Sequence, residues 1–138
     1  MLTSAAKTRA LANWPSSVTD EQMTPHLEGA ARELERRVGV AVYAALASAP
    51  ADDADRLAGE EIEGCLAIAY AIPALHVFAL AAGPTVPKEI EDAEFSFLDP
   101  EQAETQAAIW RARAERRFAA WDFTPDDPPA MSPRMYAI

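Results

Sequence analysis

Gly64–Gly83, GCLAIAYAIPALHVFALAAG, is a run of twenty residues without a formal charge, in a chain that is otherwise one quarter charged. About twenty apolar residues can cross a bilayer, so the run is either a membrane span or the buried helix of an all-helical domain. Alanine is its commonest residue, and Tyr70, Pro73 and His76 interrupt the apolar surface. The flanks carry no basic cluster that would orient a membrane segment. We therefore expect a buried helix and no membrane partner.

The composition points to one all-α domain. The chain has 138 residues, half of them hydrophobic, with only five glycines. This length allows one domain with a real core and is too short for two. We expect a small helical bundle of about four helices with a long central helix. Residues 1–122 would form this domain, and residues 123–138 an extended, proline-rich C-terminal arm.

Charge and cysteine content narrow the class of protein. The net charge of −10 argues against binding nucleic acid through its phosphates, which needs clustered Lys and Arg. The single Cys65 cannot form an intrachain disulfide, and we expect it to be a small buried hydrophobe. The first residues lack a signal-peptide pattern, which predicts synthesis in the cytoplasm.

The first half of the chain predicts two helices. Residues 4–13 form a short helix that Trp14-Pro15 stops. The next helix begins either at Thr19, which opens a capping-box pattern, or at Thr24, which precedes a proline. It runs to about residue 47, with Gly39 inside it to allow close approach of a neighbouring backbone. Its apolar face would consist of Leu27, Ala31, Leu34, Val38, Ala41 and Ala45.

The second half predicts two longer helices. The central one spans about residues 53–82, and Pro73 should kink it. Its core positions would be Leu57, Ile62, Leu66, Ala69, either Ile72 or Pro73, His76 and Leu80. The last helix spans about residues 100–121, with Pro100 at its first position. Its apolar face would consist of Ala103, Ala107, Trp110, Ala114, Phe118 and Trp121.

Residue sets that would support catalysis are missing from the sequence. His26 and His76 lie fifty residues apart, and neither a zinc motif nor a glycine-rich phosphate loop occurs. We expect the neighbouring Glu60, Glu61 and Glu63 to form a solvated face. We therefore predict no catalytic, metal or cofactor site, no cofactor, and no enzymatic activity.

The C-terminal end combines prolines with apolar residues. Four prolines make a helix impossible and favour an extended conformation. The apolar side chains Met131, Met135, Tyr136 and Ile138 have little reason to remain in solvent. The arm packs on its own domain, docks on another chain or remains disordered.

The order of these elements resembles the head–tail connector proteins of tailed bacteriophages, also called head-completion or adaptor proteins. The resemblance covers about residues 18–120. It rests on the second helix, where the family pattern is matched by Thr19, Leu27, Ala31, Leu34, Glu35 and Gly39.

The resemblance implies a structural virion protein in the neck of the particle, made in the host cytoplasm. Copies of the chain would form a homo-oligomeric ring under the portal protein, with a tail-side completion protein as a further partner. DNA would pass through an acidic lumen without sequence-specific binding. The arm residues would dock on the portal or on a neighbouring subunit.

A closed ring needs two unlike, complementary faces on each subunit. We predict that one is acidic and the other basic. The acidic face would hold Asp52, Asp53, Asp55, Glu60 and Glu61, and the basic face Arg111, Arg113, Arg116 and Arg117. Two rival classes remain: a small helical accessory or regulatory protein that binds a single protein partner, and a small membrane-associated protein built on residues 64–83.

Overall fold

The computed structural model describes residues 1–82 and 100–121, and for residues 76–82 the backbone alone. Its helices are α1 (Ala5–Ala12), α2 (Asp20–Val38), α3 (Val40–Ser48), α4 (Ala54–Ala82) and α6 (Pro100–Ala120). The described residues contain no β-strand, which confirms the all-α class. Within the same ranges, no helix combines the length and the apolarity that crossing a bilayer demands.

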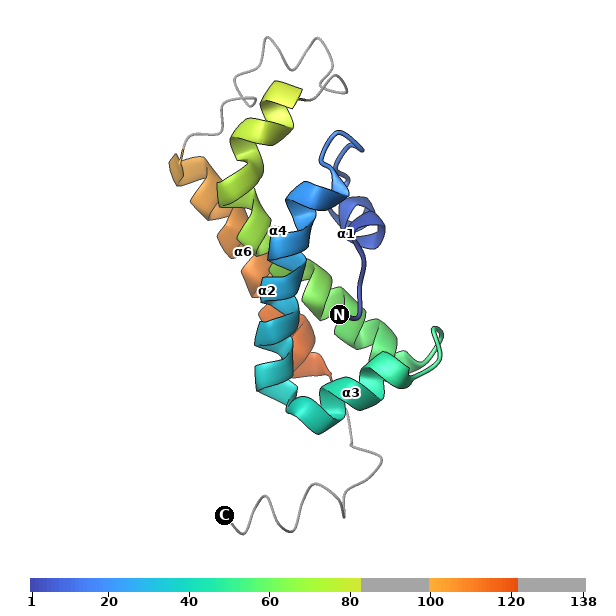
Figure 1. The fold of residues 1–138 in the computed structure, drawn as a ribbon. Helices are drawn as coiled ribbons and strands as arrows, with labels where there is room; N and C mark the ends of the chain where they lie inside the picture. Colours follow the sequence, from blue (N-terminus) through green and yellow to red (C-terminus); the bar gives the residue numbers. More distant parts are fainter. Residues whose placement is uncertain (83–99, 122–138) are drawn as a thin grey trace.

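Helix α4 forms the centre of the fold. It packs against both α2 and α6 (Figure 1), and α1 and α3 also contact it. Ile62, Leu66 and Ile68 are fully buried, and Cys65 between them is buried as predicted. Burial of one such aliphatic side chain stabilises a fold by about 1.5–3 kcal/mol. The uncharged run therefore lies, over its described part, among the chain's own helices.

The predicted starts and ends of the helices are largely confirmed. Ser4 caps α1, and Asn13 ends it in the left-handed conformation at φ 61°. Helix α4 begins one residue later than expected and continues through Pro73. Helix α6 starts with Pro100 at its first position, as predicted. The C-terminal arm and the side chains of His76 and Leu80 lie outside the described residues.

The choice between Thr19 and Thr24 is settled by a complete capping box. The Thr19 hydroxyl accepts a hydrogen bond from the Gln22 backbone N–H at 3.2 Å, and the Gln22 side chain accepts one from the Thr19 backbone N–H at 2.9 Å. The Thr24 hydroxyl instead donates to the carbonyl of Asp20. The helix therefore starts at Asp20 and includes Pro25 in its second turn.

Replacing Thr19 with alanine is expected to lower the free energy of unfolding by about 1 kcal/mol, because the cap oxygen is lost. Thr24→Ala is the matched control and should change stability by less than about 0.5 kcal/mol, since its hydroxyl is exposed and caps nothing. Urea unfolding of both variants measures the difference. Equal effects of the two substitutions would contradict the assignment of Thr19 as the cap.

The prediction of one helix running to residue 47 was wrong. Gly39 adopts φ 97° and ψ 152°, which ends α2 and starts α3 in a new direction. Ala41 and Ala45 are exposed as a result, and Val42, Tyr43 and Leu46 are the buried residues of α3. The reason given for Gly39 was also wrong, because a Cβ there would meet nothing within 4 Å. The backbone conformation, and not a close neighbour, requires glycine.

The prediction was wrong for one core residue of α4. Leu57 is 48% exposed, whereas its neighbour Ala58 is buried. A close approach does occur one residue further on, at Gly59. A Cβ there would lie 2.9 Å from Leu2 Cδ1, 3.6 Å from Leu46 Cδ1 and 3.7 Å from Trp121 Cη2. Gly59 thus marks the point where the N-terminal segment, α3 and the residue after α6 meet on α4.

Candidate functional site

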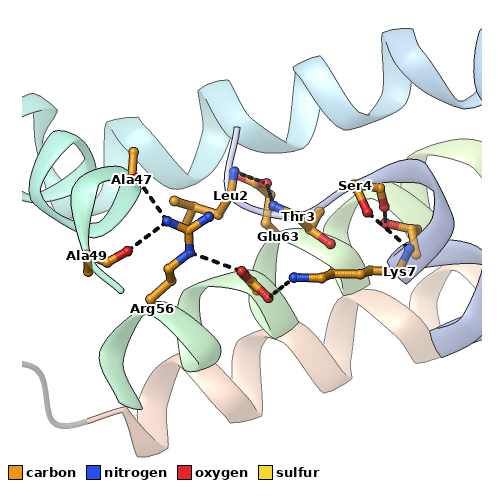
Figure 2. A network of polar contacts seen from close by, with 10 residues as sticks. Leu2, Thr3, Ser4, Lys7, Ala47, Ala49, Arg56 and Glu63 are labelled. Atoms are coloured by element: carbon orange, nitrogen blue, oxygen red, sulfur yellow. Dashed lines mark hydrogen bonds and ion pairs between the residues drawn. The ribbon is translucent and has the colours of Figure 1, made fainter. Parts of the chain in front are cut away.

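A buried carboxylate on α4 holds the N-terminal segment. Glu63 is fully buried, and its Oε1 accepts hydrogen bonds from the backbone N–H groups of Leu2 and Thr3, both at 2.8 Å. Its Oε2 accepts a hydrogen bond from the Tyr43 hydroxyl at 2.5 Å. Figure 2 shows Leu2 and Thr3 turned toward this carboxylate. One side chain thereby joins the N-terminal segment, α3 and α4.

A second carboxylate, one helical turn away, is also buried. Glu60 is 8% exposed and accepts hydrogen bonds from Lys7 Nζ and Arg56 Nε, both at 3.1 Å. Arg56 Nη1 also donates to the carbonyls of Ala47 and Ala49 (Figure 2). The expected solvated face is therefore wrong for Glu60 and Glu63. Both carboxylates face the interior because donors from distant parts of the chain satisfy them.

The charge state of this cluster follows from its burial. Burial raises the pKa of Glu63, although the hydrogen bonds from Tyr43, Thr3 and Leu2 oppose the rise. Burial, and then the bond to Glu63, raises the pKa of Tyr43. Burial also raises the pKa of the Cys65 thiol to about 11. The raised pKa values leave Tyr43 and Cys65 protonated near neutral pH and poorly suited to act as nucleophiles or bases. Both oxygens of the buried Glu63 already accept hydrogen bonds from the chain itself.

A layer of ion pairs connects α2, α4 and α6. Glu33 accepts two hydrogen bonds from Arg111, at 3.0 and 3.2 Å, and one from the Tyr70 hydroxyl at 2.5 Å. One turn further on, Arg37 makes two hydrogen bonds to Glu115, both at 2.8 Å. Both bridges join residues separated by 78 positions, so α2 and α6 run in the same direction past α4.

Aromatic rings extend this layer. The Arg37 guanidinium lies 4.2 Å from the centre of the Phe118 ring, and that of Arg111 lies 5.4 Å from the Tyr70 ring. A cation over an aromatic face adds about 0.5–1 kcal/mol at such partly exposed sites. The arrangement fixes the relative position of three helices and leaves these two cations with partners inside the chain.

Acid is expected to weaken this layer. The hydrogen bonds from Arg111 hold the pKa of Glu33 below its ordinary value of 4.5. A lowered folded-state pKa gives stability that is present above pH 4.5 and is lost as the pH falls through the lowered value. Glu33→Gln should therefore show a smaller loss of stability than wild type between about pH 6 and pH 3.

Unfolding measured across this pH range tests the prediction. Glu104→Gln is the matched control, because it removes one exposed carboxylate that forms no ion pair with the described residues. Its curve should run parallel to that of wild type. If Glu33→Gln and wild type lost the same stability on acidification, the Arg111 bridge would not act in this way.

Most of the residues predicted to form the two faces have partners within the chain. Glu61 pairs with Arg117 at 2.9 Å and with Arg113 at 3.7 Å. Asp55 accepts a hydrogen bond from Trp121 Nε1 at 3.0 Å. Asp53 caps α4, since it accepts a hydrogen bond from the Arg56 backbone N–H at 3.0 Å, as expected for an acidic helix start.

Two residues of the predicted faces differ from the rest. Asp52 and Arg116 are exposed, and within the described ranges neither forms an ion pair. The contact between subunits stays a prediction, and these two side chains are its cleanest probes. The docking residues of the arm, Met131, Met135, Tyr136 and Ile138, lie outside the described residues.

Most of the buried polar groups described above could not be predicted from sequence patterns. Glu33 and Arg37 stand four positions apart, a spacing that indicates a pair on one helix face. No local signal identifies Glu63 or Tyr43 as buried partners. Among residues 1–82 and 100–121, no group of three or more metal-ligating side chains comes together. No protein family model, curated protein or solved structure matches the chain.

Proposed function

We propose that the chain is a structural virion protein, a head–tail connector that forms a ring under the portal. In this role it joins the head to the tail and lets DNA pass through its lumen. The observation that carries the proposal is the match between the connector pattern and one structural unit, helix α2 with its two ends.

Each residue of that pattern has a defined position in α2. Thr19 is the cap, and Leu27 and Leu34 are buried in the core. Ala31 packs against the same core. Gly39 ends the helix, with its N–H donating to the Glu35 carbonyl at 2.8 Å. The residues of the pattern therefore span one complete capped helix, which supports the proposal.

The distribution of charge also supports the proposal. Eight of the 22 acidic residues, but only two of the 12 basic residues, fall in segments 83–99 and 122–138. In the described part, most arginines are paired with carboxylates of the same chain. Cations held in this way are poorly available to DNA phosphates, and DNA slides best along a surface that does not bind it.

The function is tested by mixing the full chain with the portal protein that the proposal assigns to the same particle. Electron microscopy should show a ring of this chain on one face of the portal, and particles lacking the protein should fail to retain DNA or to join tails. A monomer or two-fold dimer that leaves the portal bare would overturn the proposal and favour the accessory protein with a single partner.

The predicted contact between subunits has its own test. Arg116→Glu should abolish ring assembly on the portal, and adding Asp52→Lys in the same chain should restore it, because the two charges are exchanged across the interface. Arg36→Glu is the matched control, since it reverses an exposed arginine of α2 with no ion pair in the described part of the chain. Assembly of Arg116→Glu at the wild-type level would reject the contact.

A further inference from the structure

Helix α3 presents an uncharged face that nothing described covers. None of its nine residues carries a charge. Val42, Tyr43 and Leu46 are buried against the rest of the fold. The opposite side holds Val40, which is 71% exposed, together with the exposed Ala41, Ala44, Ala45 and Ala47. At a rise of 1.5 Å per residue, this face is about 14 Å long.

The described chain ends beside α3. Trp121 is buried, and its indole N–H binds Asp55 at the start of α4. Trp121 and Leu46 of α3 both lie within 4 Å of the position that a Cβ on Gly59 would take. Figure 1 shows the end of α6 at the same end of the molecule as α3. The last described residue before the C-terminal arm therefore lies close to α3, on the side of Leu46.

The sequence of residues 122–138 favours an extended conformation over a locally folded one. Its prolines at positions 125, 128, 129 and 133 favour an extended polyproline conformation. At about 3.1 Å per residue, Met131 would then lie about 30 Å from Trp121. That distance is about twice the length of α3, so an extended arm has the reach to bring Met131 to a neighbouring molecule.

We propose that the apolar end of the C-terminal arm, residues 131–138, docks on the exposed face of α3 in a second copy of the chain. Met131, Met135, Tyr136 and Ile138 supply the apolar side chains, and methionine adapts well to a shallow face lined by alanine. The contact is head-to-tail, since the arm and the α3 face are different surfaces. This proposal rests on the ring proposed above, in which the arm docks on a neighbouring subunit. It identifies the exposed face of α3 as the surface that receives the arm.

Disulfide trapping between two full-length variants tests the contact. A chain with Ala44→Cys is mixed with a size-tagged chain with Met135→Cys and oxidised gently, so that any disulfide between the introduced cysteines joins two molecules. Docking should raise the yield at least about tenfold over a control, because it brings the thiols to a high effective concentration. The control pairs Met135→Cys with Ala112→Cys, an exposed alanine of α6. The native Cys65 is buried and is present in all of these variants alike.

Two outcomes would overturn the proposal. One is a yield equal to that of the Ala112→Cys control. The other is a disulfide that forms only within a single chain carrying both Ala44→Cys and Met135→Cys, which would mean that the arm covers its own α3. A third full-length variant, Ala44→Glu, is tested by pull-down with the Met135→Cys chain. It should no longer associate with that chain, while its helical circular dichroism stays unchanged.

The result is separable from the function proposed above. Trapping without any binding to the portal would retain the arm contact and reject the connector. A portal-bound ring without trapping would retain the connector and reject the arm contact.

Discussion

Replacing Glu63 with alanine is expected to lower the free energy of unfolding by about 4 kcal/mol, because three buried donors lose their acceptor at once. Two of these donors are the backbone N–H groups of Leu2 and Thr3, and the third is the Tyr43 hydroxyl. Each donor left without a partner in the interior costs about 1–3 kcal/mol. Part of this cost is offset, since the variant no longer has to bury a carboxylate.

Variants at neighbouring positions separate the causes. Glu63→Gln keeps one oxygen for the N-terminal N–H groups and should lose only about half as much stability as the alanine variant. Glu61→Ala is the matched control on the same helix. Its carboxylate is partly exposed, and its pairs with Arg113 and Arg117 should be worth no more than about 1 kcal/mol.

Hydrogen exchange measures locally whether the N-terminal segment is released when Glu63 is replaced. In wild type, the amides of Leu2 and Thr3 should exchange slowly, because Glu63 holds both of them. In Glu63→Ala they should exchange as an open segment does, even where the core of α4 stays protected. Unchanged protection of these two amides, or a loss of stability no larger than that of Glu61→Ala, would contradict the role assigned to Glu63.

Helix positions were accessible from the sequence because their signals are local. The capping pattern at Thr19, the proline at position 100 and the apolar spacing of α4 each lie within a few residues of the element that they define. The buried carboxylates were not accessible. Glu60 and Glu63 resemble solvated residues at a helix start until Lys7, Leu2 and Thr3 approach from more than fifty positions away.

The charged residues of α6 illustrate the same limit. Their clustering suggested a basic face available to another subunit. In the structure, Arg111 binds Glu33, and Arg117 binds Glu61, because α2 and α4 bring these carboxylates alongside α6. Composition indicates how many charges a chain has, but the packing of helices decides which of them remain for a partner.

The glycine at position 39 is a local sequence signal, but its role is defined by the structure. Replacing Gly39 is expected to have the second large effect. Its φ of 97° and ψ of 152° belong to a region of backbone space that only glycine occupies readily. Gly39→Ala should lower the free energy of unfolding by about 1–3 kcal/mol. The alternative response, a continuous helix through residue 39, would turn α3 away from the core and break the bond from Tyr43 to Glu63, which also costs stability.

Gly29→Ala provides the control for this prediction, since it makes the same chemical change inside α2. A Cβ at position 29 would lie 3.7 Å from the Tyr70 ring, which is ordinary contact, and alanine favours a helix over glycine by about 1 kcal/mol. Gly29→Ala should therefore be neutral or stabilising in urea unfolding, whereas Gly39→Ala destabilises. If both substitutions stabilised the protein, α2 and α3 would be one helix in solution. The exposed face of α3 described above would then not exist in that form.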